Sequence, residues 1–283
     1  MSTTIATSPE NAPPHVGFLG IEIDVVTKRQ LTSLVASSIC DGGRRVIAHH
    51  NLHSLYLFHR VPEMQSFYQK AAFTHADGMS LVLLAKLLGV ELSRENRIGY
   101  MDWIDDLMTA ASASSWRLFY LGSKPGIAAQ GAAVLRDRYP GLQIEVADGY
   151  FDQEATSADC REMIEAINAY CPHILFVGMG MPRQERWIAE NLDAIQANVI
   201  LPCGAFIDYV AGVIPTPPRW LGRLGFEWLY RLISEPRRLG HRYLVEPWFL
   251  PGLMWRYWRV DRAKSRESSP RTYTRELTRR RPR

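Results

Sequence analysis

The chain has 283 residues, of which 47% are hydrophobic and 22% charged, values that are ordinary for a soluble globular protein. This length can bury a full core and corresponds to one large or two small domains. Residues 219–283 hold 17 Lys and Arg against six Asp and Glu, so they carry +11, and residues 1–218 carry −7 of the total +4. This asymmetry predicts an anionic partner for the C-terminal end: nucleic acid, a phosphate-bearing ligand or an anionic membrane surface.

Features that the sequence lacks exclude several classes of protein. Its four cysteines are Cys40, Cys160, Cys171 and Cys203. They form no CxxC pair, so we expect neither a disulfide framework nor a zinc site. Residues 1–15 lack the basic flank and apolar run of a secretory signal, and no apolar run reaches about 18 residues. We therefore expect a cytoplasmic protein without a spanning helix and with residues 1–15 disordered.

The body of the chain alternates short apolar runs with helical patterns. In chain order, the patterns first predict a strand or hairpin at 16–26, a helix at 31–39 capped by Thr27 or Thr32, a strand at 45–50, a helix from Leu55 to Lys70, an apolar piece at 72–78, and helices at 81–88 and 103–113. They then predict a strand at 116–121, a helix at 127–139, a strand at 143–146, a helix at 157–170, and strands at 174–177 and 199–206. Strands that alternate with helices at this spacing predict a Rossmann-like α/β fold, with a mostly parallel, doubly wound sheet flanked by helices.

One stretch of this pattern carries a candidate binding turn. The strand at 174–177 is followed by Gly178 and Gly180, and Pro182 stands where a helix can begin. The N–H groups that a helix leaves free at its start favour an anionic ligand, and residues 183–185 would lie in that first turn. The alternative is that the glycines only let strand and helix pack closely.

Three histidines gather at the end of the strand predicted at 45–50. His49, His50 and His53 could ligate a metal, but they alternate faces and have no carboxylate at ligand spacing. We therefore favour hydrogen bonding to a substrate by this segment, which also contains Asn51.

Asp77 stands where an apolar piece meets a helix. A carboxylate at such a junction can contact a ligand, or it can cap the helix that follows. From its position alone, capping is the favoured role.

The glycine turn at 122–126 matches neither a P-loop nor a dinucleotide-binding fingerprint. It lacks the GxxxxGK[ST] spacing and the GxGxxG pattern, so we expect neither ATP nor a nicotinamide cofactor.

The character of the sequence changes after residue 212. Residues 214–218 form a rigid, proline-rich connector, and the segment beyond is basic, rich in tryptophan and interrupted by prolines. We divide the chain into an α/β domain (16–212), a C-terminal helical basic appendage (213–258) and a basic, disordered tail (259–283). The appendage is suited to lie on a membrane surface without crossing it. The alternative is an ordinary helical hairpin whose aromatic side chains complete the core.

An ordered set of motifs resembles the WecG/TagA/CpsF glycosyltransferase family. The matching pieces are Asn51, Ala76-Asp77-Gly78, Arg97-Ile-Gly99-Tyr-Met-Asp102, Tyr120-Leu-Gly122-Ser-Lys-Pro-Gly126, Gly149-Tyr-Phe151, Gly178-Met-Gly180-Met-Pro-Arg-Gln184-Glu185, Asp208-Tyr-Val-Ala-Gly212, and Gly225-Phe-Glu-Trp-Leu-Tyr-Arg231-Leu232 with Glu235-Pro-Arg237-Arg238. The similarity covers about residues 16–243. Each motif is weak alone, but eight in order make a specific signal.

The resemblance implies an inverting glycosyltransferase that needs neither a metal nor another cofactor. It implies transfer from a UDP-sugar to a polyprenyl-diphosphate-linked saccharide at the cytoplasmic membrane face, in bacterial polysaccharide synthesis. In this reading Asp77 is the general base, which reverses the preference for capping. Other motif positions become substrate-binding candidates: His49, Asn51, Arg97, Gly99, Asp102, Gly122, Gly178, Gly180, Gln184, Glu185 and Asp208. The family's appendage arginines, here Arg231, Arg237 and Arg238, would stabilise the departing diphosphate.

The sequence also departs from the family pattern. His49 replaces a common threonine, Thr216 replaces a basic residue, and Ile207 replaces a phenylalanine. The donor therefore stays open between N-acetylmannosamine, glucose and another hexose. The alternative function is a non-catalytic nucleotide-sugar or nucleic-acid-binding module that uses the basic tail. The tail matches no nucleic-acid-binding module, so we expect no nucleic-acid partner, and the sequence leaves a homo-oligomer open.

Overall fold

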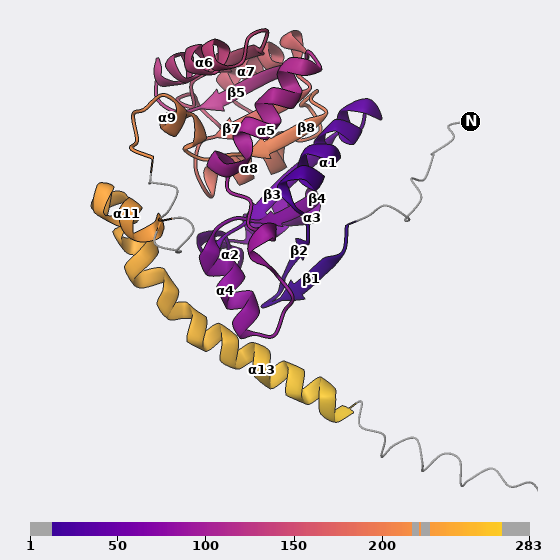
Figure 1. The fold of residues 1–283 in the computed structure, drawn as a ribbon, viewed down its shortest axis with the longest axis vertical. Helices are drawn as coiled ribbons and strands as arrows, with labels where there is room; N and C mark the ends of the chain where they lie inside the picture. Colours follow the sequence, from indigo (N-terminus) through magenta and orange to yellow (C-terminus); the bar gives the residue numbers. More distant parts are fainter. Residues whose placement is uncertain (1–12, 217–220, 222–226, 268–283) are drawn as a thin grey trace, which may run out of the picture.

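A computed structural model of the chain describes residues 13–216, 221 and 227–267. Six parallel strands form the central sheet, in the spatial order β4-β3-β8-β7-β5-β6. In chain order they are β3 (Arg45–His50), β4 (Ala71–Ala76), β5 (Arg117–Gly122), β6 (Gln143–Ala147), β7 (Ile174–Gly178) and β8 (Val199–Pro202). Helices cover both faces of this sheet (Figure 1), so the predicted Rossmann-like α/β fold is confirmed.

Two layers of helices enclose the sheet. One layer consists of α1 (Lys28–Cys40), α5 (Tyr100–Ala113), α6 (Ile127–Arg138) and α9 (Phe206–Val210), and the other of α3 (Pro62–Lys70), α7 (Ala158–Tyr170) and α8 (Arg183–Asn191). Successive side chains of a strand point to opposite faces, so each central strand supplies both layers. In β7, Ile174 and Phe176 pack with the first layer, and Leu175 and Val177 with the second. The unbroken apolar run that predicted β7 therefore marks a strand buried on both faces.

A third apolar cluster lies beside β4, at one edge of the sheet. The antiparallel strands β1 (His15–Phe18) and β2 (Ile21–Asp24) pack there with α2 (Leu52–Phe58) and α4 (Met79–Leu87). The Asp24 carboxylate accepts a hydrogen bond from the backbone N–H of Thr74 in β4 at 2.6 Å, which ties the hairpin to the sheet. Of the strand or hairpin predicted here, the structure has the hairpin. Residues 1–12 of the predicted disordered N-terminus lie outside the described residues, and His15, which was included in it, begins β1.

The single helix expected from Leu55 to Lys70 is wrong. The structure has two helices, α2 and α3, with a break at Val61, whose φ of −125° and ψ of 107° are extended. Pro62 opens α3 at its first turn. A residue before proline is pushed out of the helical region, so the chain must leave one helix before Pro62 begins the next.

The other predicted elements are found, with most of their ends shifted by a few residues. A short 3₁₀ helix, η2 (Arg94–Asn96), precedes α5, and the strand expected at 199–206 ends at Pro202. Thr27 and Ser157 cap α1 and α7, where each side chain accepts from a backbone N–H of the first turn.

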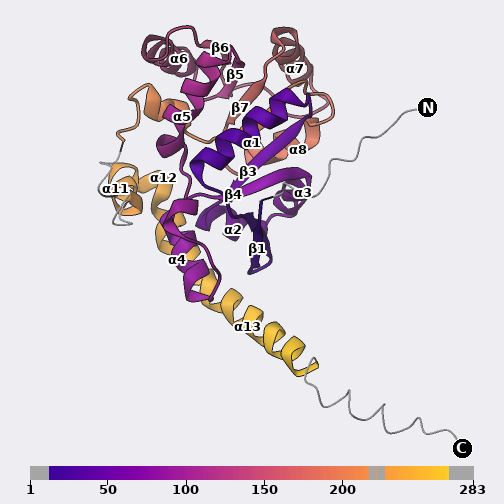
Figure 2. The ribbon, with the colours of Figure 1, turned by 45° about the vertical axis from the view of Figure 1, so that its right-hand side comes forward.

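The C-terminal appendage runs along the side of the α/β body as a series of short helices. They are α11 (Glu227–Ser234), α12 (Pro236–Gly240), the π-helix η3 (His241–Val245), the 3₁₀ helix η4 (Glu246–Phe249) and α13 (Leu250–Glu267), and α13 projects beyond the body in both views (Figures 1 and 2). Phe249, Leu253 and Met254 pack against the third apolar cluster. The boundary predicted at residue 259 thus falls inside α13, and residues 268–283 lie outside the described part of the chain.

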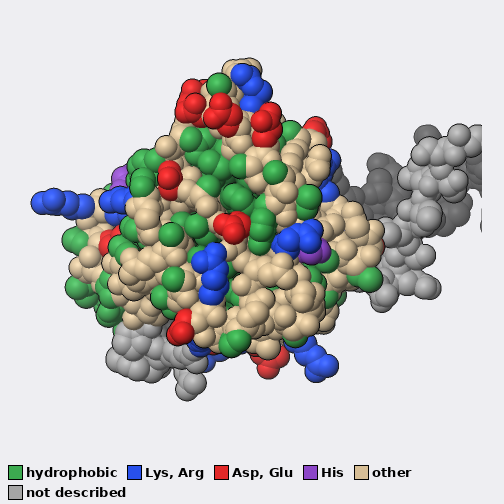
Figure 3. Space-filling model, turned by 90° about the horizontal axis from the view of Figure 1, so that it is seen from above, with side chains coloured by type: hydrophobic (Ala, Val, Ile, Leu, Met, Phe, Trp, Pro, Cys, Tyr) green, Lys and Arg blue, Asp and Glu red, His purple; other side chains and the backbone are tan. Residues whose placement is uncertain are grey.

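Charged side chains are distributed unevenly between body and appendage. Seen from the end that carries α6 and α7, acidic side chains gather at one edge of the molecule, and basic ones stand apart from one another (Figure 3). The appendage instead carries Arg231, Arg237, Arg238 and Arg242 within one short stretch.

Gly178 permits a close approach between the ends of the central strands. A Cβ at this position would lie 2.0 Å from the hydroxyl oxygen of Tyr120 and 2.7 Å from the backbone oxygen of Gly204. In the same way, a Cβ on the paired Gly122 would lie 2.4 Å from the backbone oxygen of Gly178. For these two glycines, close packing explains the residue type without a ligand.

Gly178→Ala should destabilise the fold. The added methyl group meets a backbone oxygen that belongs to the neighbouring strand connection, so we expect the free energy of unfolding to fall by about 1–3 kcal/mol. Urea denaturation followed by circular dichroism measures this change. Gly240→Ala is the control, because a Cβ at that helical position has no atom within 4 Å and is expected to be neutral or to stabilise by up to about 1 kcal/mol. Equal midpoints for Gly178→Ala and the wild type would contradict the packing role.

Candidate active site

A pocket of about 540 Å³ opens at the carboxyl ends of four neighbouring strands. His49 at the end of β3, Asp77 after β4, Gly180 after β7 and Cys203 after β8 all line it. Parallel strands place their carboxyl ends at one edge of the sheet, which is where open α/β sheets bind ligands.

Most of the predicted site residues meet in this pocket. Ten line it: His49, Asn51, Asp77, Arg97, Gly99, Asp102, Gly180, Gln184, Arg231 and Arg238. Five do not line it: Gly122, Gly178, Glu185, Asp208 and Arg237. The first set comes from six separate segments of the chain, so the tertiary fold assembles it.

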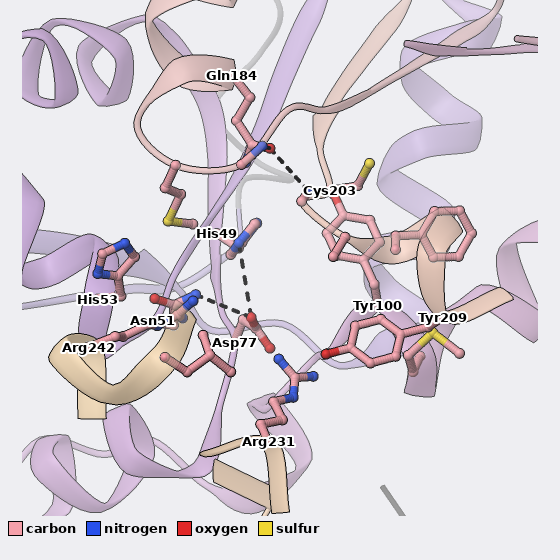
Figure 4. Close-up of a pocket in the computed structure, with 18 of the residues that line it drawn as sticks. His49, Asn51, His53, Asp77, Tyr100, Gln184, Cys203, Tyr209, Arg231 and Arg242 are labelled. Carbon is pink, nitrogen blue, oxygen red and sulfur yellow. Dashed lines mark hydrogen bonds and ion pairs between the residues drawn. The ribbon is translucent and has the colours of Figure 1, made fainter. Parts of the chain in front are cut away.

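Asp77 lies at the centre of the pocket, with polar groups on several sides (Figure 4). Its Oδ2 atom is 3.4 Å from the Nδ2 of Asn51, which donates to it, and 4.0 Å from the Nε2 of His49. Its backbone N–H donates to the carbonyl of His50 at 2.7 Å, which fixes the residue at the end of the sheet. Arg231 of the appendage points toward the carboxylate from another side (Figure 4). The carboxylate is thus held in place while part of it remains open to the pocket.

The capping role first favoured for Asp77 is wrong. The N-cap of α4 is Gly78, and no side chain makes a capping hydrogen bond there. Gly78 has a φ of +94°, a conformation that glycine adopts without the strain of a side chain. The carboxylate of Asp77 is therefore available to the pocket.

Asn51 has two tasks at the start of α2. Its Oδ1 accepts from the backbone N–H of Ser54 at 3.0 Å and caps the helix, while its Nδ2 donates to Asp77. The Ser54 hydroxyl in turn accepts from the backbone N–H of Asn51 at 2.8 Å. This reciprocal cap orients the amide so that its donor side faces Asp77.

His49 is a nearly buried residue of the pocket wall, with only 5% of its surface exposed. Burial lowers the pKa of its imidazole, although the nearby Asp77 carboxylate acts in the opposite direction. Its Nδ1 is buried without a hydrogen-bond partner among the described residues. An unpartnered lone pair costs less than an unpartnered N–H, so this arrangement favours a neutral ring whose Nε2–H faces Asp77.

The segment that precedes α5 closes another side of the pocket. Arg97 and Asp102 form an ion pair across the turn. Between them, a Cβ on Gly99 would lie 3.4 Å from Asp77 Oδ1 and 3.5 Å from Asp102 Oδ2. The absence of a side chain at Gly99 thus keeps space open between the two carboxylates.

Gln184 joins two turns of the pocket wall. Its side-chain oxygen accepts from the backbone N–H groups of Gly180 at 3.0 Å and Gly204 at 3.1 Å (Figure 4). Its amide nitrogen donates to Oε1 of Glu185 at 2.8 Å. The N–H of Gly180, in the turn before the helix, is therefore already bonded to Gln184.

Glu185 lies beneath the pocket wall and does not reach the cavity. Only 1% of its surface is exposed, and its Oε2 has no hydrogen-bond partner among the described residues. Burial raises the pKa of this carboxyl to about 7, although the hydrogen bond from Gln184 acts against the shift. We predicted that Glu185 contacts the donor directly, but its side chain does not line the pocket. It accepts a hydrogen bond from Gln184 instead.

The remaining predicted residues outside the pocket have other partners. Asp208 accepts a hydrogen bond from the Ser123 hydroxyl at 2.6 Å, which ties α9 to the turn after β5. Arg237 is exposed on α12. Its neighbour Arg238 does line the pocket. The two are adjacent arginines of one motif, so the sequence could not show which of them reaches the pocket.

The appendage supplies cationic side chains to the cavity. Arg231 lies over the ring of Tyr209, with its Cζ atom 5.2 Å from the ring centre. Arg238 is paired with Glu235 inside the appendage through two contacts of 2.6 Å. Arg242 also lines the pocket, and burial lowers the pKa of its guanidinium. A negatively charged ligand is the natural complement of these groups.

Several residues that line the pocket were not predicted as site residues. They include His53, Tyr100, Tyr209, Arg242 and Glu246, whereas Arg183 lines the pocket from the helix turn that the sequence placed beside a ligand. His53 belongs to the histidine group seen in the sequence, and Arg242 follows the matched arginines by a few residues. Tyr100, whose hydroxyl donates to the carbonyl of Pro202 at 2.9 Å, gave no signal beyond its position in a motif.

Within the part of the chain that the structure describes, no three His, Cys, Asp or Glu side chains are arranged to hold a metal ion. The histidine group is divided among different tasks. His50 bonds through Nδ1 with the Ser54 hydroxyl at 3.0 Å and stacks on Tyr68 with ring centres 3.8 Å apart. His53 contacts the appendage residue Glu246.

Comparison with known proteins gives a consistent result. The sequence profile of the "Glycosyl transferase WecG/TagA/CpsF family" matches residues 16–264. Proteins from Staphylococcus aureus strains MW2, NCTC 8325 / PS 47 and COL are each 24% identical over 235 residues, which cover 80% of this chain and 87% of the relative. Each is named N-acetylglucosaminyldiphosphoundecaprenol N-acetyl-beta-D-mannosaminyltransferase.

Glu185→Gln should make the protein more stable at alkaline pH. The folded pKa of about 7 lies above the value of 4.5 expected for an unfolded glutamate. The folded state therefore loses stability as the pH rises from 4.5 to 7, by up to about 3 kcal/mol, and the loss persists above pH 7. Glutamine removes this loss and can still accept from Gln184. Urea denaturation of both proteins at pH 5 and pH 8 should show the variant gaining relative to the wild type at pH 8.

Glu190→Gln, on the exposed side of the same helix, is the matched control and should show no such gain. A Glu185→Gln advantage that is equal at both pH values would contradict a buried, titrating carboxyl.

Proposed function

Because the chain belongs to the WecG/TagA/CpsF family and is therefore a glycosyltransferase, we propose that it transfers a sugar from a UDP-sugar to a saccharide linked to polyprenyl diphosphate. The relatives from Staphylococcus aureus are named for a lipid-diphosphate-linked acceptor of this kind. Family membership also favours catalysis over the alternative of a non-catalytic binding module.

The observation that carries this proposal is the position of Asp77 in a pocket that the appendage arginines also enter. Asp77 takes the proton of the acceptor hydroxyl as that oxygen bonds to the anomeric carbon of the sugar. The bond from this carbon to the UDP diphosphate breaks, and its electron pair leaves with the phosphate oxygen. Attack opposite to the leaving group inverts the anomeric configuration.

The charge that develops on the diphosphate is stabilised by arginines in this proposal. Arg231 and Arg242 line the same cavity as Asp77, and arginine presents several N–H donors to a phosphate. Preorganised donors that face a developing negative charge lower the barrier for its departure. The transfer therefore does not depend on a divalent cation.

We place the protein at the inner surface of the cell membrane, where a lipid-linked acceptor would be available. None of the described residues forms a helix that is long and apolar enough to span a bilayer. Large apolar side chains of the appendage are nevertheless exposed: 58% of Leu244, 53% of Val245, 80% of Trp248 and 54% of Trp255. Exposed tryptophans beside arginines suit the membrane interface. Since Phe249 and Leu253 pack on the body, one side of the appendage also completes the core, as in the alternative hypothesis.

The donor sugar is best identified directly. A panel of UDP-linked N-acetylmannosamine, glucose and other hexoses, incubated with polyprenyl-diphosphate-linked acceptors and followed by mass spectrometry, tests the reaction class. We expect one donor to give product, with a yield unchanged by EDTA. The absence of transfer from every UDP-sugar would overturn the proposed reaction.

Asp77→Asn should abolish transfer and leave donor binding largely intact. The amide cannot accept the acceptor's proton, whereas its size is almost unchanged, so we expect kcat to fall by at least about 10²-fold. Calorimetric titration with the UDP-sugar should give a dissociation constant within about threefold of the wild-type value. A variant with near-normal turnover would refute the role of Asp77.

Leu244→Glu combined with Trp248→Glu should release the protein from anionic vesicles. The substitutions place charge on the exposed apolar side of η3 and η4, where burial in lipid would be costly. Sedimentation with vesicles that contain phosphatidylglycerol measures the bound fraction. Val134→Glu is the control, because Val134 is 43% exposed on α6, away from the appendage. Equal sedimentation of the double variant and the control would contradict the proposed contact surface.

A further inference from the structure

One contact between the appendage and the body joins a largely buried histidine to a buried carboxylate. The Nδ1 of His53, in the first turn of α2, lies 2.6 Å from the Oε2 of Glu246 in η4. Only 16% of the His53 side chain and 8% of the Glu246 side chain are exposed. A separation this short is typical of a charge-assisted hydrogen bond.

The second oxygen of Glu246 also faces a histidine. Its Oε1 is 3.5 Å from the Nδ1 of His241, a residue of η3 whose side chain is 65% exposed. Phe249, the last residue of η4, packs edge-on against Tyr56 of α2, with ring centres 5.3 Å apart. The Glu246 carboxylate is therefore held between the two parts of the molecule, and its place depends on the docking of the appendage.

This contact leaves one ring nitrogen of His53 unused. Nδ1 is committed to Glu246, and Nε2 makes no hydrogen bond with the described residues. Both His53 and Glu246 line the pocket that contains Asp77. A carboxylate that fixes one nitrogen of an imidazole directs the other, and in the doubly protonated ring that second nitrogen is a donor.

The surroundings of His53 suit an anion. The pocket is lined by six arginines and four carboxylates. His53 and Arg242 lie on the side of the pocket that carries Asn51 (Figure 4). A phosphate oxygen on this side could accept from the histidine and from an arginine together.

We propose that His53 is a further catalytic residue, whose Nε2–H donates to an oxygen of the departing diphosphate, and that Glu246 is the positioning residue that aims it. This inference rests on the proposed function. As the bond from the anomeric carbon to the phosphate oxygen breaks, the electron pair stays on that oxygen and the acceptor's proton goes to Asp77. His53 keeps its own proton and stabilises the added charge through a hydrogen bond. The Nε2–H group of His53 is held in position only when the appendage is docked on the body. Docking of the appendage and stabilisation of the leaving group are therefore coupled.

The test uses UDP as the probe, with the full-length chain and the variants His53→Gln, Glu246→Gln and both together. Loss of a charged hydrogen bond should weaken UDP binding about tenfold in calorimetry and lower kcat by about 10²-fold in the transfer assay. Because the two residues act as one unit, the double variant should be within about twofold of His53→Gln. If the fold-losses of the two single variants multiply to give the loss of the double variant, the two residues act independently and the proposed pairing is overturned.

A spectroscopic signature separates this role from a merely structural one. In ¹⁵N NMR, the His53 Nε2 resonance, assigned by its loss in His53→Gln, should be that of a protonated nitrogen and should shift when UDP is added. In Glu246→Gln, the signal of the Nδ1–H bonded to the carboxylate should disappear while the circular dichroism spectrum is unchanged. A neutral His53 ring in the UDP complex, or an unshifted Nε2, would overturn the proposal.

His59→Gln is the matched control. His59 follows the same helix, bonds to the carbonyl of Leu19 at 2.8 Å and packs near Phe249 with ring centres 6.0 Å apart, but it does not line the pocket. It should bind UDP as the wild type does. If the wild type binds UDP and His53→Gln binds it equally well, the inference fails and the proposed function stands. If the wild type does not bind UDP, the proposed function fails and the inference falls with it.

Discussion

The parallel arrangement of six strands is the constraint on which the rest of the structure depends. It brings the ends of β3, β4, β7 and β8 to one edge of the sheet, so that residues more than a hundred positions apart in sequence line one pocket. Within the same sheet, the close approach of the ends of β5 and β7 requires Gly122 and Gly178, where a Cβ would collide with neighbouring atoms. The glycines thus contribute to the site by permitting the sheet that forms it.

Charge compensation governs the pocket that this edge provides. Asp77 lies among an amide donor, a buried imidazole and Arg231 of the appendage, so polar groups from both parts of the molecule surround its carboxylate. Asp77 belongs to the α/β body, whereas three of the six arginines that line the pocket belong to the appendage: Arg231, Arg238 and Arg242. A site divided in this way is complete only when the two parts are docked, and Phe249 and Leu253 provide apolar contacts for that docking. The docking thereby connects the appendage with the pocket that contains Asp77.

The errors of the sequence interpretation have local physical causes. The helix expected from Leu55 to Lys70 ignored Pro62, whose effect on Val61 breaks the helix. The capping role of Asp77 was inferred from its position alone. The family motif already spoke against it, and the structure has no side-chain cap at the start of α4. The family resemblance implied that Glu185, like Gln184, contacts the donor, yet adjacent residues of a helix point in different directions, and only Gln184 of the two lines the pocket.

The sequence by itself determined the alternation of strands and helices. A strand that is buried on both faces must be apolar throughout, and the helices between such strands have apolar residues at helical spacing. It also determined the family, because eight motifs in order are specific even where each is short. Only the tertiary structure decided which side chains share the pocket. Arg238 reaches the pocket and Arg237 does not, and His53 meets Glu246 across 193 positions. Such contacts depend on how the appendage packs against the body, and packing between distant segments leaves no periodic pattern in a single sequence.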